Sequence, residues 1–504
     1  MIPMTLAEVA GAVGGAVHGC EGTELVSGSV ECDSRRVGPA GLFVAVPGAR
    51  VDGHDFAAAA VAAGATGVLA GRPVDAPSVL APAAAAGSAS TPAAAAGSAS
   101  TPYALAADAD GVGAAVLAAL ARLARAVVDE LSQPRAEVPA GLRVVGLTGS
   151  SGKTSTKDMV AALLAPLGPT VAPPGSFNNE IGHPWTALRA EAHTRHLVLE
   201  LSARGIGHVA QLCQVAPPSI GVVLNVGSAH LGEFGTRDAV AAAKGELVEA
   251  LPAEGIAVLN ADDAAVAAMD RRTAAQVVRF GLSAAAHVRA TDITLDDRGR
   301  PSFRLVTPVG ETEVRLAVPG EHQVSNALAA AAVALELGAT PAGIAAVLAG
   351  YLPVSRWRME VTERSDGVTV VNDAYNANPE SVAVALRTLV AMAGVQRRSW
   401  AVLGPLGELG VAEAVAHRDI GILAARLGVD RLVVVGERAQ PMHVGFSGDG
   451  LSSVLVPDVP AALELLRGEL APGDVVLVKA SRAVGLERIA DGLLGAGPQE
   501  RGCR

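Results

Sequence analysis

The sequence of 504 residues contains no hydrophobic run long enough to cross a membrane, although half of its residues are apolar. Alanine and glycine supply much of that apolar content, and aromatic residues make up only 3% of the chain. The best candidate for a span, residues 56–71, is rich in alanine and glycine and falls short of the ~20 residues that a bilayer requires. The N-terminus has neither a basic start nor an apolar run, so we expect no signal peptide and a cytoplasmic protein without stable membrane insertion.

Cysteine and positive charge are also scarce. The net charge of −11 argues against a general nucleic-acid binder, although it leaves room for a local basic pocket that holds phosphates. We expect a monomer that acts on small molecules and has no nucleic-acid partner. No two cysteines have the spacing of a metal site, so we expect free thiols in a reducing compartment. These cysteines are Cys20, Cys32, Cys213 and Cys503.

The length of the chain predicts about three domains, since one hydrophobic core rarely serves more than roughly 250–300 residues. Short apolar runs alternate with helical patterns in two separate stretches. This alternation is typical of parallel sheets covered by helices on both faces. We therefore predict an α/β fold with an N-terminal domain at 1–141, a central parallel-sheet domain at 142–353 and a smaller doubly wound domain at 354–504.

A ten-residue sequence is repeated in tandem at 82–91 and 92–101. It contains no charge and no large apolar residue, so it has nothing to contribute to a hydrophobic core. A helical pattern resumes beyond it, at 104–131. We expect a disordered surface insertion at about 76–103, inside the first domain and without a chemical role.

A glycine-rich loop at 148–155 lies between a short apolar run at 142–147 and a helical pattern at 157–167. A strand, a glycine loop ending in Gly-Lys-Thr and a helix together form the layout of a phosphate-binding loop. The backbone N–H groups of the loop and the helix N-terminus are expected to face the phosphates of a nucleotide. Lys153 would supply a positive charge, and the hydroxyl of Thr154 would reach a Mg²⁺ ion.

The loop departs from the standard pattern at one position. That pattern requires a glycine where Leu147 stands, and the glycine is found instead at Gly149. A simple glycine-rich turn before a helix is the alternative, but the strand, the helix and the Gly-Lys-Thr sequence all favour a nucleotide site. The residues expected to contact the nucleotide are Gly149, Ser150, Ser151, Gly152, Lys153, Thr154 and Ser155.

Polar residues follow several of the predicted strands, and ligands bind at such strand ends in open α/β sheets. Glu200 ends the second strand of the central domain, where it would either ligate Mg²⁺ or make a structural hydrogen bond. His230 follows the third strand and is a candidate metal or phosphate ligand, the alternative being a structural histidine. Taken alone, Lys244 has the pattern of a solvated lysine, and helix capping explains Asn326 without any ligand.

Several of these segments together resemble the Mur ligase family. The phosphate loop has that family's form, Thr-Gly-x-x-Gly-Lys-Thr, and matching segments continue from end to end of the chain. Two positions depart from the family pattern: Ser150 and Ser151 replace the commoner Thr-Asn, and Trp357 precedes Arg358 where glycine is usual. The repeat has no counterpart in the family. The matching segments are 33–35, 52–54, 176–184, 200–208, 225–230, 243–246, 260–263, 319–326, 372–379, 407–410 and 479–482.

The resemblance implies an N-terminal domain that binds a UDP-linked substrate, a central ATPase domain and a C-terminal Rossmann-like domain. It implies that ATP, with Mg²⁺, phosphorylates the terminal carboxylate of UDP-N-acetylmuramoyl-tripeptide. The amine of D-alanyl-D-alanine would then attack the acyl phosphate, which yields a peptidoglycan precursor. A sister ligase that adds a different amino acid, or an enzyme similar to folylpolyglutamate synthase, remains open.

The resemblance also implies roles for individual residues. Lys153 would hold the β- and γ-phosphates and act in catalysis. The predicted metal ligands are Thr154 and Glu200 for one Mg²⁺ and His230 with a carbamoylated Lys244 for a second. The predicted ATP contacts outside the loop are His322 and Asn326 at adenine, with Arg358 and Asp373 reaching in from the C-terminal domain. The predicted substrate contacts are Asp33, Ser34 and Arg35 at the UDP end, with Asn178 and Asn179.

A nucleotide switch that binds partner proteins is an alternative from another class. A GTPase of that kind needs Asn-Lys-x-Asp after a strand to recognise guanine. The nearest match, at 260–263, is Asn-Ala-Asp-Asp and lacks the lysine. The sequence therefore favours an ATP-dependent enzyme.

Overall fold

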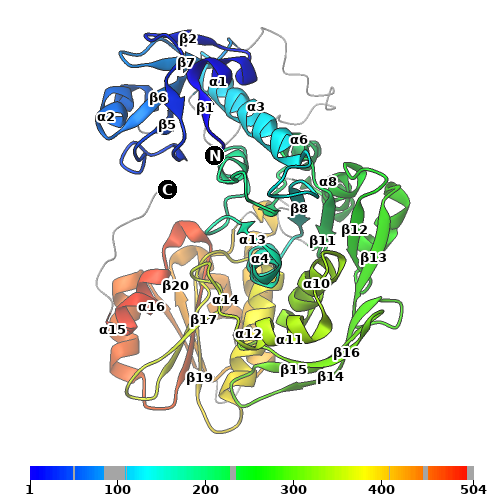
Figure 1. Ribbon diagram of the computed structural model, residues 1–504. Coiled ribbons are helices and arrows are strands. Elements are labelled where there is room, and N and C mark those ends of the chain that lie inside the picture. Colours follow the sequence, from blue (N-terminus) through cyan, green and yellow to red (C-terminus); the bar gives the residue numbers. More distant parts are fainter. Residues whose placement is uncertain are drawn as a thin grey trace.

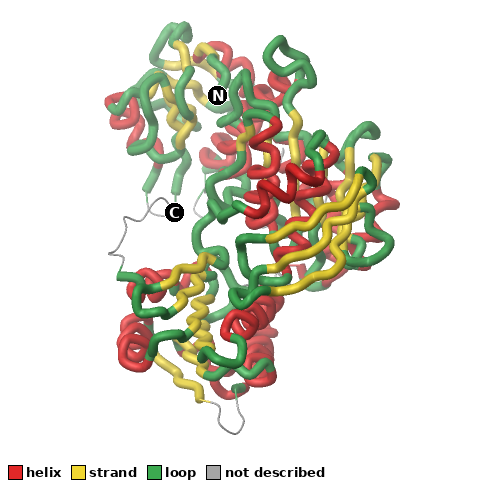
Figure 2. The backbone as a smooth tube through the Cα atoms, turned by 60° about the horizontal axis from the view of Figure 1, so that its bottom comes forward, coloured by secondary structure: helices red, strands yellow, loops and turns green. Residues whose placement is uncertain are grey.

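The computed structural model describes residues 1–48, 51–83, 108, 110–227, 234–407, 409–446 and 452–495. Within these ranges the chain forms three large sheets, each with helices packed on it (Figures 1 and 2). The sheets follow one another along the chain, which confirms the predicted three-part α/β fold. Over the same residues, no helix is both long enough and apolar enough to cross a membrane.

The first sheet has five strands in the order β2-β7-β6-β5-β4, and β4 to β7 run parallel. Ser78–Leu80 forms β7, so the insertion predicted at about 76–103 begins later than expected; its remainder, 84–103, lies outside the described residues. A short antiparallel pair, β1 and β3, lies beside this sheet. The elements are β1 (Met4–Thr5), α1 (Leu6–Val13), β2 (Ala16–His18), β3 (Leu25–Val26), β4 (Val30–Glu31), β5 (Gly41–Val44), α2 (Ala57–Ala62), β6 (Ala65–Ala70) and β7.

Helix α3 (Val112–Ser132) joins the first sheet to the second (Figure 1). Its apolar side chains recur at helical spacing, and Val116, Leu120 and Val127 are completely buried. One part of the helix packs on α1 and β6, and another packs on α5 (Gly182–Ala187) and α6 (His208–Val215) of the central part. A single hydrophobic cluster therefore runs through both parts of the molecule.

The central sheet has nine strands in the order β16-β15-β14-β13-β12-β11-β8-β10-β9. The strands from β9 to β14 in this order are parallel, as predicted, but β14, β15 and β16 pair antiparallel, which was not predicted. Side chains alternate between two clusters, so that α4 and α10 cover one face and α6 and α8 the other. The strands are β8 (Arg143–Thr148), β9 (Thr170–Val171), β10 (His196–Glu200), β11 (Ile220–Val223), β12 (Ile256–Asn260), β13 (Gln276–Gly281), β14 (Val288–Leu295), β15 (Pro301–Thr307) and β16 (Gly310–Arg315). The remaining helices are α4 (Lys153–Leu164), α8 (Arg237–Glu249), α9 (Ala264–Ala267), α10 (His322–Glu336) and α11 (Pro341–Ala349).

The third sheet has six strands in the order β17-β18-β22-β19-β20-β21, all parallel except β17. Helices α12, α13 and α14 share one hydrophobic cluster with it, and α15 and α16 share another. This is the doubly wound arrangement expected for the C-terminal part. The elements are β17 (Glu360–Glu363), β18 (Thr369–Asn372), α12 (Pro379–Ala393), β19 (Ser399–Leu403), α13 (Glu413–Arg426), β20 (Arg431–Val435), α14 (Gln440–Gly445), β21 (Ser452–Val456), α15 (Val459–Glu469), β22 (Val475–Lys479) and α16 (Glu487–Leu493).

The cysteines that the structure describes agree with the expectation of free thiols. Cys20, Cys32 and Cys213 form no disulfide. Burial, together with the smaller effect of the nearby Glu246 carboxylate, raises the pKa of Cys213 to about 12, so this thiol stays protonated at neutral pH. Cys503 lies outside the described residues.

The core of the central part supports a first test of the fold. Phe280 on β13 is fully buried among the side chains that α10 places on the sheet. Replacing it with alanine leaves a cavity, so Phe280→Ala is expected to lower the free energy of unfolding of the central part by about 3–5 kcal/mol. Val309→Ala is the control, since that side chain is 71% exposed. Urea unfolding of both variants checks this, and equal losses for the two would contradict the described core.

Candidate nucleotide and metal site

The phosphate loop connects β8 to α4 at the carboxyl end of the central strands, as predicted. Gly152 has a φ of +80°, and a Cβ added there would lie 2.6 Å from Oδ1 of Asn326. Both the backbone conformation and the close approach therefore require glycine. Helix α4 begins at Lys153, so its first N–H groups have no intrahelical partners and face the loop's concave side, where an anion is stabilised.

Asn225, immediately beyond β11, holds the phosphate loop in shape. Its Oδ1 accepts hydrogen bonds from the backbone N–H groups of Ser150 and Ser151, each over 2.9 Å. Its Nδ2 donates to the carbonyl oxygen of Ser151 over 3.1 Å. Two loop amides expected to face phosphate are thus used inside the protein, which leaves that task to the amides at the start of α4.

Lys153 also contacts the loop from within. Its Nζ donates to the carbonyl oxygen of Gly149 over 2.8 Å, which places the ammonium group over the loop. Lys153, Thr154 and Ser155 all line a cavity of about 380 Å³. The cavity is therefore bordered by a positive charge and a helix N-terminus, the two features that bind phosphate groups.

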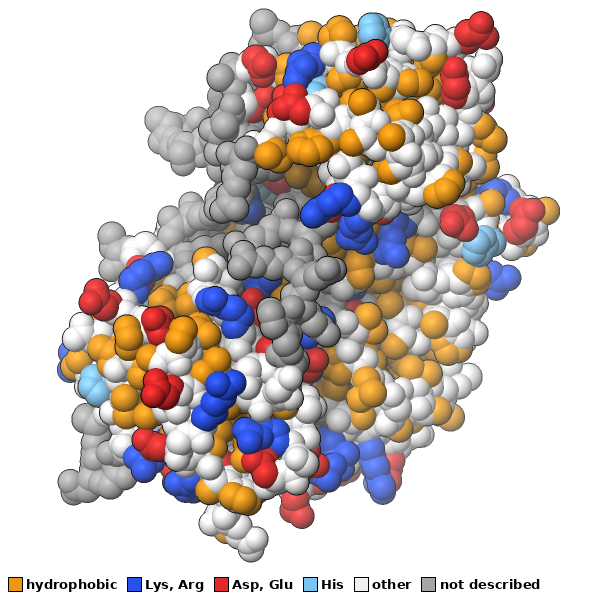
Figure 3. Space-filling view, turned by 90° about the vertical axis from the view of Figure 1, so that its left-hand side faces the viewer, with side chains coloured by type: hydrophobic (Ala, Val, Ile, Leu, Met, Phe, Trp, Pro, Cys, Tyr) orange, Lys and Arg blue, Asp and Glu red, His pale blue; other side chains and the backbone are white. Residues whose placement is uncertain are grey.

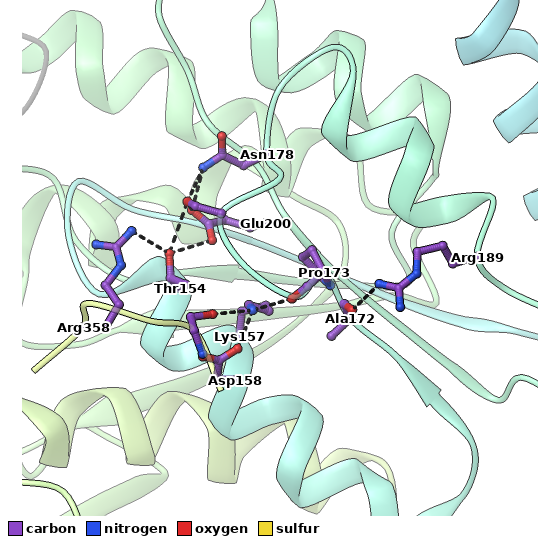
Figure 4. Close-up of polar contacts among 11 residues, drawn as sticks. Thr154, Lys157, Asp158, Ala172, Pro173, Asn178, Arg189, Glu200 and Arg358 are labelled. Atoms are coloured by element: carbon purple, nitrogen blue, oxygen red, sulfur yellow. Dashed lines mark hydrogen bonds and ion pairs between the residues drawn. The ribbon is translucent and has the colours of Figure 1, made fainter. Parts of the chain in front are cut away.

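Glu200 is the centre of a polar cluster beside the loop (Figure 4). It ends β10, is 1% exposed, and accepts a hydrogen bond at Oε2 from the Thr154 hydroxyl over 2.9 Å. Ser176 and Asn178 donate to its other oxygen over 3.0 and 2.7 Å. Arg358 reaches in from the C-terminal part and donates from Nη2 to Oγ1 of Thr154 over 3.0 Å.

This cluster fits Mg²⁺, because its donors are hard oxygen atoms of a carboxylate and two hydroxyls. Among the residues that the structure describes, no group of three or more His, Cys, Asp and Glu side chains is arranged to hold a metal. A site with one carboxylate and a hydroxyl is typical of Mg²⁺ that completes its coordination with phosphate oxygens and water. Zinc would need a fuller set of protein ligands.

Lys244 lies on α8 and is buried, with 2% of its surface exposed. Burial lowers the pKa of its amine well below the usual range, and the positive charge of Lys153 lowers it further. The lowered pKa favours the neutral amine, which has a free electron pair and is a nucleophile, over the solvated ammonium that the sequence alone suggests. His230, the predicted partner of Lys244 at a second metal ion, lies outside the described residues.

The far wall of the cavity is formed by α10 and the C-terminal part. His322, Asn326, Arg358 and Asp373 all line it, so the structure brings together every ATP contact predicted beyond the loop. Burial lowers the pKa of His322 to about 4, which keeps the imidazole neutral at pH 7. Within the described part of the chain its Nδ1 has no hydrogen-bond partner, which leaves that atom to a ligand.

Asn326 and Asp373 are already engaged inside the protein. The Asn326 carboxamide accepts from the hydroxyl of Thr156 over 3.2 Å and donates to Gln323 over 2.8 Å. Asp373 accepts from Lys479 Nζ over 2.6 Å through Oδ2. These contacts fix both side chains at the cavity wall before any ligand is present.

Trp357 occupies a position where the family usually has glycine, and the backbone explains that preference. Its φ is +59°, in the left-handed region that glycine adopts at low cost. The guanidinium of the next residue, Arg358, still reaches Thr154 and lies 4.0 Å from the ring centre of Tyr375. The departure from the family pattern therefore does not displace this arginine.

A second cavity of about 440 Å³ lies between α3 and α6. Ser202 and Arg204 line both cavities, so the two are adjacent. Asn179 lines the second cavity, whereas its neighbour Asn178 lines the first. The predicted UDP contacts, Asp33, Ser34 and Arg35, line neither; Arg35 donates to Asp33 over 2.8 Å in the turn after β4.

Sequence reasoning missed four residues of this site: Ser176, Asn225, Tyr375 and Lys479. Asn225 and Lys479 were within reach of it, because each stands at the carboxyl end of a predicted strand. Ser176 and Tyr375 lie in two of the segments that match the family, 176–184 and 372–379, but the match predicted no role for either side chain.

The contacts of Asn225 generate a test of the loop. Asn225→Ala removes three hydrogen bonds that shape the loop, at a net cost of about 2 kcal/mol, so the KM for ATP is expected to rise roughly 30-fold. Asn260→Ala is the matched control, because Asn260 ends the next strand and bonds Leu224 and Asp262 rather than the loop. Steady-state kinetics with varied ATP measure both. An unchanged KM for Asn225→Ala would show that the loop keeps its shape without this side chain.

Comparison with known proteins matches most of the chain to one family. Three family models match, described as Mur ligase family, catalytic domain (residues 28–127), Mur ligase middle domain (147–334) and Mur ligase, glutamate ligase domain (357–482). The chain is 53% identical to the UDP-N-acetylmuramoyl-tripeptide–D-alanyl-D-alanine ligase of Mycobacterium bovis, with 98% of each chain covered.

Solved structures agree with this relationship. MurF from Acinetobacter baumannii superposes with a TM-score of 0.81 at 28% identity, covering 98% of this chain and 99% of the other. MurF ligase from Thermotoga maritima in complex with ADP gives a TM-score of 0.74 at 29% identity, covering 94% of this chain and 98% of the other. The family predicted from the motifs is thereby confirmed: the chain belongs to the Mur ligase family.

Proposed function

We propose that the protein joins D-alanyl-D-alanine to UDP-N-acetylmuramoyl-tripeptide at the expense of ATP. The products are UDP-N-acetylmuramoyl-pentapeptide, ADP and phosphate, in the synthesis of peptidoglycan precursors. The observation that carries the proposal is the single cavity lined by the phosphate loop, the Glu200 cluster and Arg358 with Asp373. The full-length likeness to ligases of that name supports the choice of substrates.

The reaction needs activation because a carboxylate is a poor electrophile. A carboxylate oxygen of the tripeptide attacks the γ-phosphorus of ATP, and ADP leaves. The amine of the dipeptide then attacks the acyl carbon, and phosphate leaves with that oxygen, while the amine loses a proton. A cavity that excludes water protects the acyl phosphate from hydrolysis between the two steps.

The residues around the loop divide this work. Lys153 and the N-terminus of α4 hold the β- and γ-phosphates and offset the charge of the transferred group. Thr154 and Glu200 would hold one Mg²⁺, which would supply further positive charge at the phosphates. Arg358 adds a positive charge from the opposite wall, 3.0 Å from the Thr154 hydroxyl.

The base and ribose of ATP have partners on the far wall. The neutral imidazole of His322 suits an uncharged base such as adenine, and Asn326 lies on the same helix, one turn along. Asp373 is a hydrogen-bond acceptor for the ribose hydroxyls. Because these residues belong to two parts of the chain, closure of the C-terminal part would complete the nucleotide site.

The UDP-linked substrate has room between the first two parts. The second cavity adjoins the phosphate site through Ser202 and Arg204, so it suits the peptide arm whose carboxylate must reach the γ-phosphate. Asn178 and Asn179 lie along that route. Asp33, Ser34 and Arg35 would bind the UDP end. Basic side chains gather on the surface where the N-terminal part meets the rest of the molecule, and their positive charge suits an anion (Figure 3).

The proposal also includes the domain bounds, the oligomeric state, the location and a second metal ion. The domains are 1–141 for the UDP-linked substrate, 142–353 for ATP and 354–504 for closure over both. The protein acts as a monomer in the cytoplasm. His230 and a carbamoylated Lys244 would hold a second Mg²⁺.

The buried amine of Lys244, whose pKa is lowered, generates a test of carbamoylation. Its nitrogen attacks CO₂, an N–C bond forms, and a proton leaves, which converts the amine into an anionic carbamate able to bind Mg²⁺. Lys244→Ala is expected to lose at least ~99% of activity, and a short carboxylic acid such as acetate is expected to restore part of it by supplying the missing carboxylate.

Lys153→Ala is the matched control for that rescue. It removes an ammonium group rather than a carbamate, so a carboxylic acid has nothing to replace and activity should stay absent. Turnover measured over a range of acetate concentrations separates the two variants. Full activity of Lys244→Ala without added acid would remove Lys244 from the metal site.

The reaction itself is tested by phosphate release. The purified protein with ATP, Mg²⁺, UDP-N-acetylmuramoyl-tripeptide and D-alanyl-D-alanine is expected to release phosphate only when both other substrates are present. Lys153→Ala should release none, since the γ-phosphate loses its charged partner. Release that continues without the dipeptide would contradict the ligase assignment, and a panel of amino acids in its place distinguishes the sister ligases.

A further inference from the structure

A buried ion pair lies on α4 one turn beyond Thr154, on the side of the helix that faces the C-terminal part. It consists of Lys157, which is completely buried, and Asp158, whose side chain is 4% exposed. Lys157 Nζ donates to Oδ1 of Asp158, to the carbonyl oxygen of Pro173 over 2.7 Å and to the hydroxyl of Ser355 over 3.2 Å. The second oxygen of Asp158 accepts from the backbone N–H of Ser355 over 3.0 Å. Each of these hydrogen bonds lies within the pair or joins it to another segment.

The pair joins α4, the loop that contains Pro173 and the linker that contains Ser355, and each of these segments contributes to the polar cluster around Glu200 (Figure 4). Pro173 belongs to the loop that carries Ser176 and Asn178 to the Glu200 carboxylate. Ser355 belongs to residues 355–359, the linker, in which Arg358 reaches the Thr154 hydroxyl. The linker is consequently attached to one face of α4 at two points, Ser355 on Asp158 and Arg358 on Thr154.

The other end of the linker is held by the C-terminal part. The N–H of Trp357 donates to Glu360 over 3.2 Å, and the N–H of Met359 donates to Asp373 over 3.1 Å. Trp357 and Met359 have φ values of +59° and +51°, which non-glycine residues keep only where their surroundings enforce them. Arg356 lies between Ser355 and Trp357 and pairs with Asp491 of α16 over 4.0 Å, so within one residue the chain passes from the α4 contacts of Ser355 to contacts with the C-terminal part.

We propose that Lys157 and Asp158 are positioning residues for Arg358. They keep Ser355 on α4 at the point where the chain passes to the C-terminal part, and so bring the Arg358 guanidinium back to Thr154 each time the site closes. A buried charged pair suits this role better than apolar packing, because its hydrogen bonds form in only one position of the linker and are lost when the linker is displaced. The proposal rests on the ligase function for its activity readout.

A double-mutant cycle tests the proposal. Lys157→Met/Asp158→Leu removes both charges together, which avoids leaving one of them buried without its partner. Without the pair, Arg358 is expected to lose its orientation, so that kcat falls about tenfold while the KM for ATP changes less than about threefold. In an Arg358→Ala background the same double substitution is expected to cost less than about twofold, because the residue it positions is already absent.

A pair that merely supports the fold would lower kcat by the same factor in both backgrounds, and that result would overturn the proposal. Arg279→Met/Asp270→Leu is the matched control, since it removes an ion pair of 2.8 Å from the central part that contacts neither the linker nor the loop. It should leave kcat unchanged in both backgrounds. Phosphate release by the unaltered protein is measured first, so a failure of the ligase assignment is recognised before the cycle begins.

Amide hydrogen exchange provides a second measurement that needs no substitution. The Ser355 N–H is buried and bonded to Asp158, so it is expected to exchange at least ~100-fold more slowly than an unstructured amide, with or without a nucleotide analogue and Mg²⁺. Mass spectrometry with fragmentation at single residues resolves this amide from its neighbours. If the Ser355 amide exchanges as fast as an unstructured amide, Asp158 does not hold the linker and the proposal is overturned, even if the double variant fails to fold.

Discussion

The arrangement of the site depends on the need to satisfy one buried carboxylate, Glu200. A desolvated carboxylate is costly unless donors surround it, and its donors here come from the phosphate-loop helix and from the loop that follows β9. Arg358 extends the network to the C-terminal part through the shared Thr154 hydroxyl. Segments far apart in the sequence are therefore held together around the Glu200 carboxylate. The same carboxylate is the side chain proposed to hold Mg²⁺.

The basic residues near the cavity differ in how deeply they are buried, and this difference affects their charge. Lys153 and Arg358 lie at the cavity wall, where a nucleotide's phosphates would offset them. Lys244 is buried on α8, where burial and the positive charge of Lys153 both lower the pKa of its amine. Burial thus favours the neutral, nucleophilic form of Lys244.

Much of the fold and part of the site could be predicted from the sequence, because some residues act through local patterns. The phosphate loop and strand-end Glu200 are of this kind, since loop geometry and sheet topology dictate their places. Lys157 and Asp158 are not, because a Lys-Asp pair in a helix ordinarily predicts a solvated face and their partner Ser355 is almost 200 residues away. The antiparallel strands β14 to β16 and the late start of the insertion after β7 likewise depend on pairings that no local pattern specifies.

Helix α3 has a consequence for how the molecule behaves as a whole. Its apolar stripe belongs to one hydrophobic cluster that includes residues of both the first and the central parts. The two clusters of the C-terminal part, by contrast, contain only residues of that part among those described, and polar contacts alone tie it to α4. Hydrophobic burial makes unfolding cooperative, so the first and central sheets are expected to unfold as one unit and the C-terminal sheet as another.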